Sequence, residues 1–153
     1  MKHSVFVYGS LMSPKVVELL LGRIPKMESA CRLAGYSRHP VKNHVFPAMV
    51  PSTPTSQVDG MVWLELTDTE LKAFDWFEDV EYKRIPVTVQ PQNTNKPGRN
   101  IDAEAYLWAN PHSQLELDRE WSFDNFCTQN LDWYLTNTVG PSREEWDRVK
   151  DEL

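Results

Sequence analysis

Cysteine is scarce in this sequence, and no run of residues is long and apolar enough to span a bilayer. The two cysteines, Cys31 and Cys127, lie far apart and form no metal-type pair, so we expect free thiols, although spacing alone is also compatible with a disulfide. The apolar run Val5–Tyr8 is too short for a signal-peptide core, which favours a cytoplasmic protein. We therefore expect no role for the final Lys-Asp-Glu-Leu, a retention signal that is read only in the endoplasmic reticulum.

Basic residues are too few and too scattered to form a surface for nucleic acid or an anionic membrane. The chain has 16 Lys and Arg against 22 Asp and Glu, a net charge of -6, and a pI near 5.2. Both of those partners need concentrated positive charge. We therefore expect neither as a partner, and the composition leaves the oligomeric state open.

Several common catalytic signatures are also missing. The glycine patterns of phosphate loops and dinucleotide sites do not occur. Ser10 follows an apolar run but lacks the Gly-x-Ser-x-Gly elbow of serine hydrolases. The four histidines, His3, His39, His44 and His112, have neither helical nor Cys/His ligand spacing. Serine hydrolysis and a metal centre are therefore disfavoured.

The residues that are present predict one domain with a sizeable core, since 41% of the 153 residues are hydrophobic. β-favouring runs predict strands, with one polar loop between the last two: Val5–Tyr8, Ala30–Tyr36, Val45–Val50, Val58–Leu66, Arg84–Gln90, the loop Pro91–Asn100, and Ile101–Ala109. About six strands with irregularly placed helices predict an α+β fold on a small mixed β-barrel. We expect a single domain over residues 1–153, with a barrel core at 1–110 and a helical segment at 111–153 packed on it.

Alternation within two of these strands predicts which side chains share a face. In the strand that ends at Leu66, we expect two sets on opposite sides: Val62, Leu64 and Leu66 against Met61, Trp63 and Glu65. In the last strand, Glu104, Tyr106 and Trp108 alternate with small and apolar residues. This phase directs Tyr106 toward the same interior as Glu78, whereas a shift of the phase by one residue directs it to the other face.

Capping signals predict where the helices begin. Ser13 before Pro14 is typical of a helix start, and Gly22 of its end. Ser122 precedes a further apolar pattern, and Ser142 with Glu145 predicts a second capping box near the C-terminus. The C-terminal part should therefore contain at least two helices.

The helix predicted at Thr67–Glu78 carries a misplaced carboxylate. Thr67 and Glu70 form a capping box pattern, and Leu71 and Phe74 begin an apolar stripe that continues, by helical spacing, to Glu78. A buried carboxyl group has a raised pKa, as a general base and acid near neutral pH requires. Periodicity alone fits a frayed helix end at least as well, and other segments must decide between the two interpretations.

The segment Gly9–Met12 turns sharply between a buried strand and a helix start. Glycine lets a ligand approach the backbone, and unpaired amides in such a turn can bind a carboxylate or phosphate. Many turns of this kind bind nothing, so the signal is weak alone.

Taken together, these motifs resemble the gamma-glutamylcyclotransferase-like superfamily, most closely its branch of small plant and fungal proteins named for avirulence-induced genes. The resemblance rests on Tyr8-Gly9-Ser10-Leu11, Phe77-Glu78 and Tyr82-x-Arg84, and extends through Gly35-Tyr36, Phe46-Pro47, Val58-x-Gly60, Tyr106-x-Trp108 and Trp121-x-Phe123. It covers most of the chain and is weakest from about Asn130 onward.

The resemblance implies a small barrel with a cavity and a cofactor-independent reaction. The α-amine of a γ-glutamyl amide attacks its own γ-carbonyl, which closes 5-oxoproline and releases an amine. It implies Glu78 as the catalytic base and acid, and a substrate-binding set: Tyr8, Gly9, Ser10, Leu11, Tyr82 and Tyr106. Glu81 is the rival carboxylate, and Arg84 fits either a buried ion pair or an ordinary strand surface. A binding or regulatory module with the same fold is the alternative, and a third hypothesis is turnover of a different amide.

Overall fold

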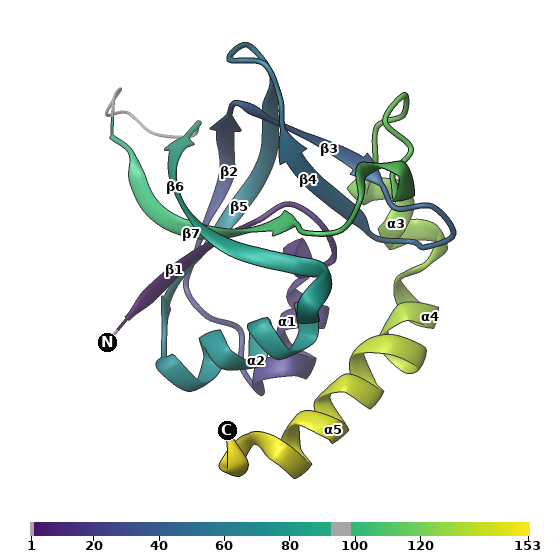
Figure 1. Cartoon of the computed structure of the whole chain (residues 1–153). Coiled ribbons are helices and arrows are strands. Elements are labelled where there is room, and N and C mark those ends of the chain that lie inside the picture. The colour runs from purple at the N-terminus through teal and green to yellow at the C-terminus, as the bar shows by residue number, and fades with distance from the viewer. Residues whose placement is uncertain (1, 93–98) are drawn as a thin grey trace.

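The computed structural model of the chain describes residues 2–92 and 99–153, which form seven strands. Their bounds are β1 (His3–Val7), β2 (Met27–Ala34), β3 (Tyr36–Pro40), β4 (Pro47–Pro51), β5 (Gln57–Leu66), β6 (Tyr82–Pro91) and β7 (Ile101–Trp108). Strands β1, β5, β2, β6 and β7 close into a barrel in that order, while β3 and β4 form a separate two-stranded sheet (Figure 1). Only the β1–β7 pair is parallel, so the barrel is mixed, as expected.

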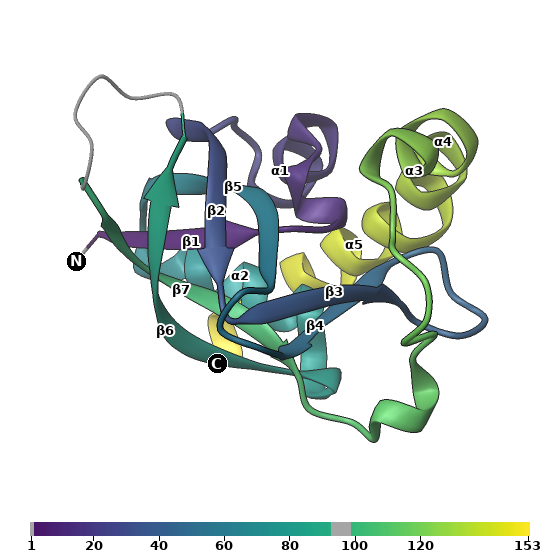
Figure 2. The ribbon, with the colours of Figure 1, turned by 90° about the horizontal axis from the view of Figure 1, so that it is seen from above.

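The barrel contains five strands because the segment expected as a strand from Val45 to Val50 becomes β4 and pairs with β3 outside the barrel. The segment expected as one strand from Ala30 to Tyr36 is divided between β2 and β3. Gly35 has a φ of +88°, a left-handed conformation that glycine adopts without steric cost. The chain therefore leaves β2 at this point and enters β3, which extends with β4 to one side of the barrel (Figure 2). The loop expected at 91–100 falls largely on residues 93–98, which lie outside the described residues.

Five α-helices follow the apolar patterns of the described residues. They are α1 (Pro14–Leu21), α2 (Asp68–Glu78), α3 (Phe123–Gln129), α4 (Leu131–Tyr134) and α5 (Gly140–Val149), and a π-helical segment, Leu135–Val139, joins α4 to α5. Figure 1 shows α2 below the barrel and the C-terminal helices running along one side of the molecule. α1, α2 and α5 contact one another.

The capping signals at Ser13, Thr67 and Ser122 begin helices as predicted, but the one at Ser142 does not. Ser142 lies inside α5, which begins at Gly140 as a continuation of the preceding π-helical segment. Its predicted capping box is therefore wrong, because residues before it are already helical and leave no helix start for its side chain to cap.

Most buried side chains of the barrel strands belong to two apolar clusters, while Trp108 of β7 lies in a third with residues of β4. One draws on all five strands and fills the barrel, with Phe6, Val62 and Ala105 among its fully buried members. The other lies between the barrel and the helices and includes Trp63 and Phe74. Alternation along the strands produces this division, since successive side chains point to opposite faces.

The predicted phase fails at the end of β5. Leu66 packs in the cluster facing the helices together with Met61 and Trp63, rather than with Val62. Glu65 has a φ of 56°, and the pairing with β1 shifts by one residue between Val5 and His3. This irregularity turns Leu66 to the opposite face.

Candidate active site

A cavity of about 140 Å³ lies where the turn after β1, the end of α2 and the C-terminal helical segment meet. Its walls come from segments far apart in the sequence: Phe6, Val7, Tyr8, Gly9, Ser10, Leu11, Phe46, Pro47, Phe77, Glu78, Glu81, Tyr82, Tyr106, Tyr134 and Thr138. Each of the seven residues named from the sequence as catalytic or substrate-binding contributes to these walls. The structure thus brings them together around one space, and leaves their roles to be tested.

Helix α2 places Glu78 in this cavity by its periodicity. The helix starts with the predicted capping box: the Thr67 amide donates to Glu70 Oε1 at 2.9 Å, and the Glu70 amide donates to Thr67 Oγ1 at 3.1 Å. Leu71 and Phe74 are buried against the barrel, and Glu78 follows Phe74 by one turn on the same side. Glu78 is the last residue of α2, so its carboxyl group is held at a defined helix end.

The carboxyl group of Glu78 has an environment that favours its protonated form. Burial, together with the nearby carboxylates of Glu81 and Asp75, raises its pKa to about 8. Within residues 2–92 and 99–153, no side chain forms a hydrogen bond or ion pair with this carboxyl group. It is therefore able to exchange a proton with a bound molecule near neutral pH.

The turn from Gly9 to Met12, a single turn of 3-10 helix over Ser10–Met12, contributes Gly9, Ser10 and Leu11 to the wall. The Met12 amide donates to the Gly9 carbonyl at 2.9 Å, and Trp63 Nε1 donates to the Leu11 carbonyl at 2.8 Å. By contrast, the amides of Gly9, Ser10 and Leu11 donate to no other described residue. These amides therefore keep an unused hydrogen-bond donor, and the residues that carry them line the cavity.

Four tyrosines surround the site, and three of them donate hydrogen bonds that brace it. Tyr8 donates to the Tyr106 carbonyl at 2.7 Å, Tyr82 donates to the Pro47 carbonyl at 2.8 Å, and Tyr106 donates to Asp75 Oδ1 at 2.7 Å. The Tyr134 hydroxyl lies 3.3 Å from Ser10 Oγ. Burial is the largest cause that raises the pKa of each of these phenols, so all four are neutral at physiological pH.

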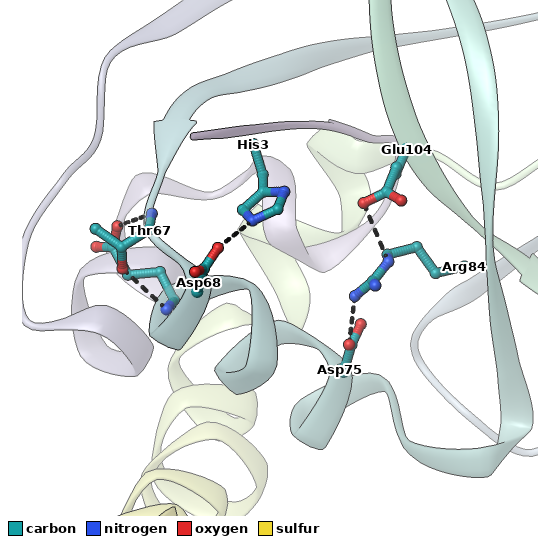
Figure 3. A network of polar contacts seen from close by, with 7 residues as sticks. His3, Thr67, Asp68, Asp75, Arg84 and Glu104 are labelled. Atoms are coloured by element: carbon teal, nitrogen blue, oxygen red, sulfur yellow. Dashed lines mark hydrogen bonds and ion pairs between the residues drawn. The ribbon is translucent and has the colours of Figure 1, made fainter. Parts of the chain in front are cut away.

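Arg84 forms a partly exposed ion pair, because its side chain is 30% exposed and that of its partner Asp75 is 42% exposed. It donates to Asp75 on α2 through Nη1, and its Nε lies 3.1 Å from Glu104 Oε2 on β7 (Figure 3). Asp75 therefore accepts from both Arg84 and Tyr106. The partner is a half-exposed carboxylate and not the buried one that the sequence offered as a possibility, and the pair links α2 to β6 and β7 beside the cavity.

Sequence reasoning missed part of the cavity wall. Tyr134 and Thr138 come from α4 and the π-helical segment, where the sequence indicated only helix packing. Phe46 and Phe77 appeared in the motifs but not among the expected binding residues. The one available signal was the apolar pattern through Tyr134, which indicates burial but not the neighbours of the buried group.

Other kinds of site find no support in the described part of the chain. No group of three or more His, Cys, Asp or Glu side chains there is arranged to hold a metal ion. None of the helices in residues 2–92 and 99–153 combines the length and apolar character that crossing a membrane requires. Cys31 is buried and Cys127 half-buried, and both are free thiols, as expected.

Both a family model and a curated relative match the sequence over most of its length. The family model described as "Gamma-glutamyl cyclotransferase, AIG2-like" matches residues 5–123. The chain is 39% identical to AIG2-like protein D of Arabidopsis thaliana over 151 residues, which cover 99% of this chain and 95% of that protein. The match includes both the turn after β1 and the end of α2.

Solved structures share the fold. A solution structure of an Arabidopsis thaliana protein matches with a TM-score of 0.67 and 26% identity, covering 99% of this chain and 87% of that one. A structure titled gamma-glutamyl cyclotransferase matches with a TM-score of 0.60 and 21% identity, covering 72% of this chain and 68% of that one. The barrel and its helices are therefore an arrangement that other sequences also adopt.

Proposed function

The chain belongs to the family described as gamma-glutamyl cyclotransferase, AIG2-like, and from this premise we propose that it releases 5-oxoproline from a γ-glutamyl amide. One observation carries the proposal. An unpaired carboxyl group, that of Glu78, shares a cavity with three backbone amides that have no partner among the described residues. Such a pair provides a proton acceptor and an anion site for one small molecule.

The amides of the turn bind the α-carboxylate of the substrate in this scheme. This anchoring holds the α-amine near the γ-carbonyl of the same molecule, and the attack is intramolecular. Orientation of this kind lowers the barrier by several kcal/mol, up to about 7–11 kcal/mol in well-oriented systems. Apolar and aromatic walls, including Phe77 and Tyr82, exclude water from the closing ring.

Glu78 transfers protons at both stages of the reaction. Its carboxylate accepts a proton from the α-ammonium group, and the freed amine nitrogen attacks the γ-carbon to form the ring C–N bond. The bond from that carbon to the leaving nitrogen then breaks as Glu78 returns this proton to it. The regenerated carboxylate takes the second proton of the ring nitrogen and passes it to the released amine. The products are 5-oxoproline and a protonated amine, so atoms and charge balance. A pKa near 8 suits exchange with amines close to neutral pH.

The cavity also favours some leaving groups over others. Its charged lining residues are Glu78 and Glu81, and no Lys, Arg or His stands among the residues that line it. A leaving amine that carries its own carboxylate would meet repulsion here without a compensating cation. We therefore expect neutral or cationic γ-glutamylamines to be better substrates than γ-glutamyl amino acids.

A panel of γ-glutamylamines and γ-glutamyl amino acids, assayed for 5-oxoproline, tests the function. The wild-type chain should release 5-oxoproline from at least one compound, and Glu78→Gln should lose turnover while keeping the fold by circular dichroism. Glu81→Gln is the matched control: it removes the rival carboxylate from the same cavity and should retain turnover. Full activity in Glu78→Gln would remove Glu78 as the catalyst. A folded wild-type chain that yields no product from any compound would favour the binding module instead.

A further inference from the structure

Asp75 occupies a junction between the cavity wall and a charged network. It lies one turn before Glu78 on α2 and accepts hydrogen bonds from the Tyr106 hydroxyl at 2.7 Å and from Arg84. Arg84 extends the network to Glu104, 3.1 Å from its Nε. Three elements, α2, β6 and β7, are thereby tied together (Figure 3), one helical turn before Glu78.

A second, polar cavity of about 270 Å³ adjoins the first, and the two share part of their walls. The second cavity is lined by Asp75, Asp79, Tyr82, Arg84, Glu104 and Tyr106. Tyr82 and Tyr106 also line the cavity that contains Glu78. The charged network therefore lies beside the cavity that contains Glu78 and contacts it through Tyr106, which lines that cavity.

We propose that Asp75 and Arg84 are positioning residues: Asp75 holds Tyr106 in the cavity wall, and the charge balance between Asp75 and Arg84 sets the pH range in which Glu78 accepts a proton. The inference rests on the proposed function for its consequence in catalysis. The electrostatic coupling of Asp75 and Arg84 to Glu78 is a property of the free protein and can be measured without a substrate.

The groups that face Glu78 give this coupling a definite sign. The carboxylates are Glu81, from the turn after α2, and Asp75; the phenols are those of Tyr8, Tyr82, Tyr106 and Tyr134. None of these groups is a cation. The negative charge of Asp75 disfavours ionisation of Glu78, and Arg84 offsets part of that charge because it pairs directly with Asp75. Removing the charge of Asp75 should therefore lower the pKa of Glu78, and removing the charge of Arg84 should raise it.

This sign distinguishes the proposal from a purely structural ion pair that joins α2 to β6. A structural pair predicts that Asp75→Asn and Arg84→Gln weaken the fold in a similar way and leave the titration of Glu78 unchanged. The proposal predicts that the titration midpoint falls in Asp75→Asn and rises in Arg84→Gln. A shift of about half a pH unit is expected for each, since the charges act across one helical turn in a partly solvated site.

The test follows the side-chain carboxyl carbon of Glu78 by NMR across a pH titration of ¹³C-labelled protein, with the Glu78→Gln spectrum as the assignment. Asp75→Asn should lower the midpoint, Arg84→Gln should raise it, and Arg84→Lys should restore it toward the wild-type value. Glu104→Gln is the matched control, because it removes a carboxylate from the same arginine but does not face Glu78. Its midpoint should stay with that of the wild type.

Unchanged midpoints in both Asp75→Asn and Arg84→Gln, shifts of the same sign, or an equal shift in Glu104→Gln would overturn the proposal. If Asp75→Asn does not fold, the Arg84→Gln and Arg84→Lys pair decides alone. In an active enzyme, the acid limb of kcat/KM should move in parallel with the NMR midpoint. Shifted midpoints without any 5-oxoproline release would retain the coupling and reject the proposed function, while turnover with unshifted midpoints would do the reverse.

Discussion

The hydroxyl groups of Ser10 and Tyr134 lie 3.3 Å apart although 124 positions separate them in the chain. Ser10 belongs to the turn after β1, and Tyr134 is the last residue of α4. The Tyr134 ring also packs edge-on against Phe77, one residue before Glu78, with centroids 6.3 Å apart. A single side chain from the C-terminal segment therefore touches both halves of the candidate site.

Tyr134→Phe should weaken substrate binding more than it weakens the fold. The ring and its packing remain, but the turn loses the hydroxyl that supports Ser10, a contact worth about 1 kcal/mol. We expect KM to rise about fivefold with a smaller change in kcat, and stability to urea to fall by no more than about 1 kcal/mol. Trp133→Phe, at the exposed neighbouring position, is the control and should change neither. An unchanged KM in Tyr134→Phe would show that the C-terminal segment does not support the turn.

Thr67→Ala should lower stability without altering the chemistry at the other end of α2. Thr67 accepts from the Glu70 amide, and loss of such a cap costs about 1 kcal/mol. Thr69→Ala, an exposed position in the first turn of the same helix, is the control and should be neutral or slightly stabilising. Urea unfolding of both variants measures the difference. A loss of kcat in Thr67→Ala at a temperature where it is fully folded would mean that the helix start influences Glu78 directly.

Local signals in the sequence were sufficient to predict how α2 positions its carboxylate. The capping box at Thr67 defined the start of the helix, and the stripe through Leu71 and Phe74 pointed to Glu78 on the inner side; the structure has both features. These signals work because each involves residues within one or two turns of one another. Periodicity could not show what lies opposite Glu78, and the resemblance to a known family supplied that part.

Features that depend on an unusual backbone conformation or on contacts between distant segments could not be predicted from the sequence. The left-handed φ of Glu65 reverses the face of Leu66, and glutamate carries no residue-specific signal for that conformation. Ser142 has the residues of a cap but sits inside a helix already under way. Tyr134 reaches the cavity only because α4 packs beside α2 and the turn after β1, which no pattern within the C-terminal segment indicates.

Gly9→Ala should damage the cavity by a direct clash. The φ at Gly9 is -128°, which any residue adopts, but an added Cβ would lie 2.9 Å from Cγ and Cδ of Pro47. Pro47 would have to move, together with the hydrogen bond that its carbonyl accepts from Tyr82. We expect turnover to fall roughly ten- to hundredfold, and stability to fall by about 1–3 kcal/mol.

The control for Gly9→Ala is Gly35→Ala, which introduces backbone strain without a clash. Gly35 has a φ of +88° and no heavy atom within 4 Å of the added Cβ. This variant should lose about 1–2 kcal/mol of stability and retain its turnover. Equal turnover in Gly9→Ala and the wild type would show that Pro47 moves aside without disturbing the site.

The raised pKa of Glu78 predicts a stability that falls as the solution becomes alkaline. The pKa of the Glu78 carboxyl group is about 8 in the folded chain, against its ordinary value of 4.5 in the unfolded chain. Between these values the folded state binds one more proton than the unfolded state, so the free energy of unfolding decreases with rising pH. The contribution is fully present below pH 4.5 and is lost as the pH passes through about 8.

Glu78→Gln removes this linkage. The difference in unfolding free energy, Glu78→Gln minus wild type, should therefore grow by about 2–4 kcal/mol between pH 5 and pH 9 in urea titrations. Asp124→Asn, an exposed carboxylate of α3, serves as the control and should show a constant difference. Parallel curves for Glu78→Gln and the wild type would mean that Glu78 is ionised in the folded chain at neutral pH. Its pKa would then be too low for efficient proton exchange with the substrate amine.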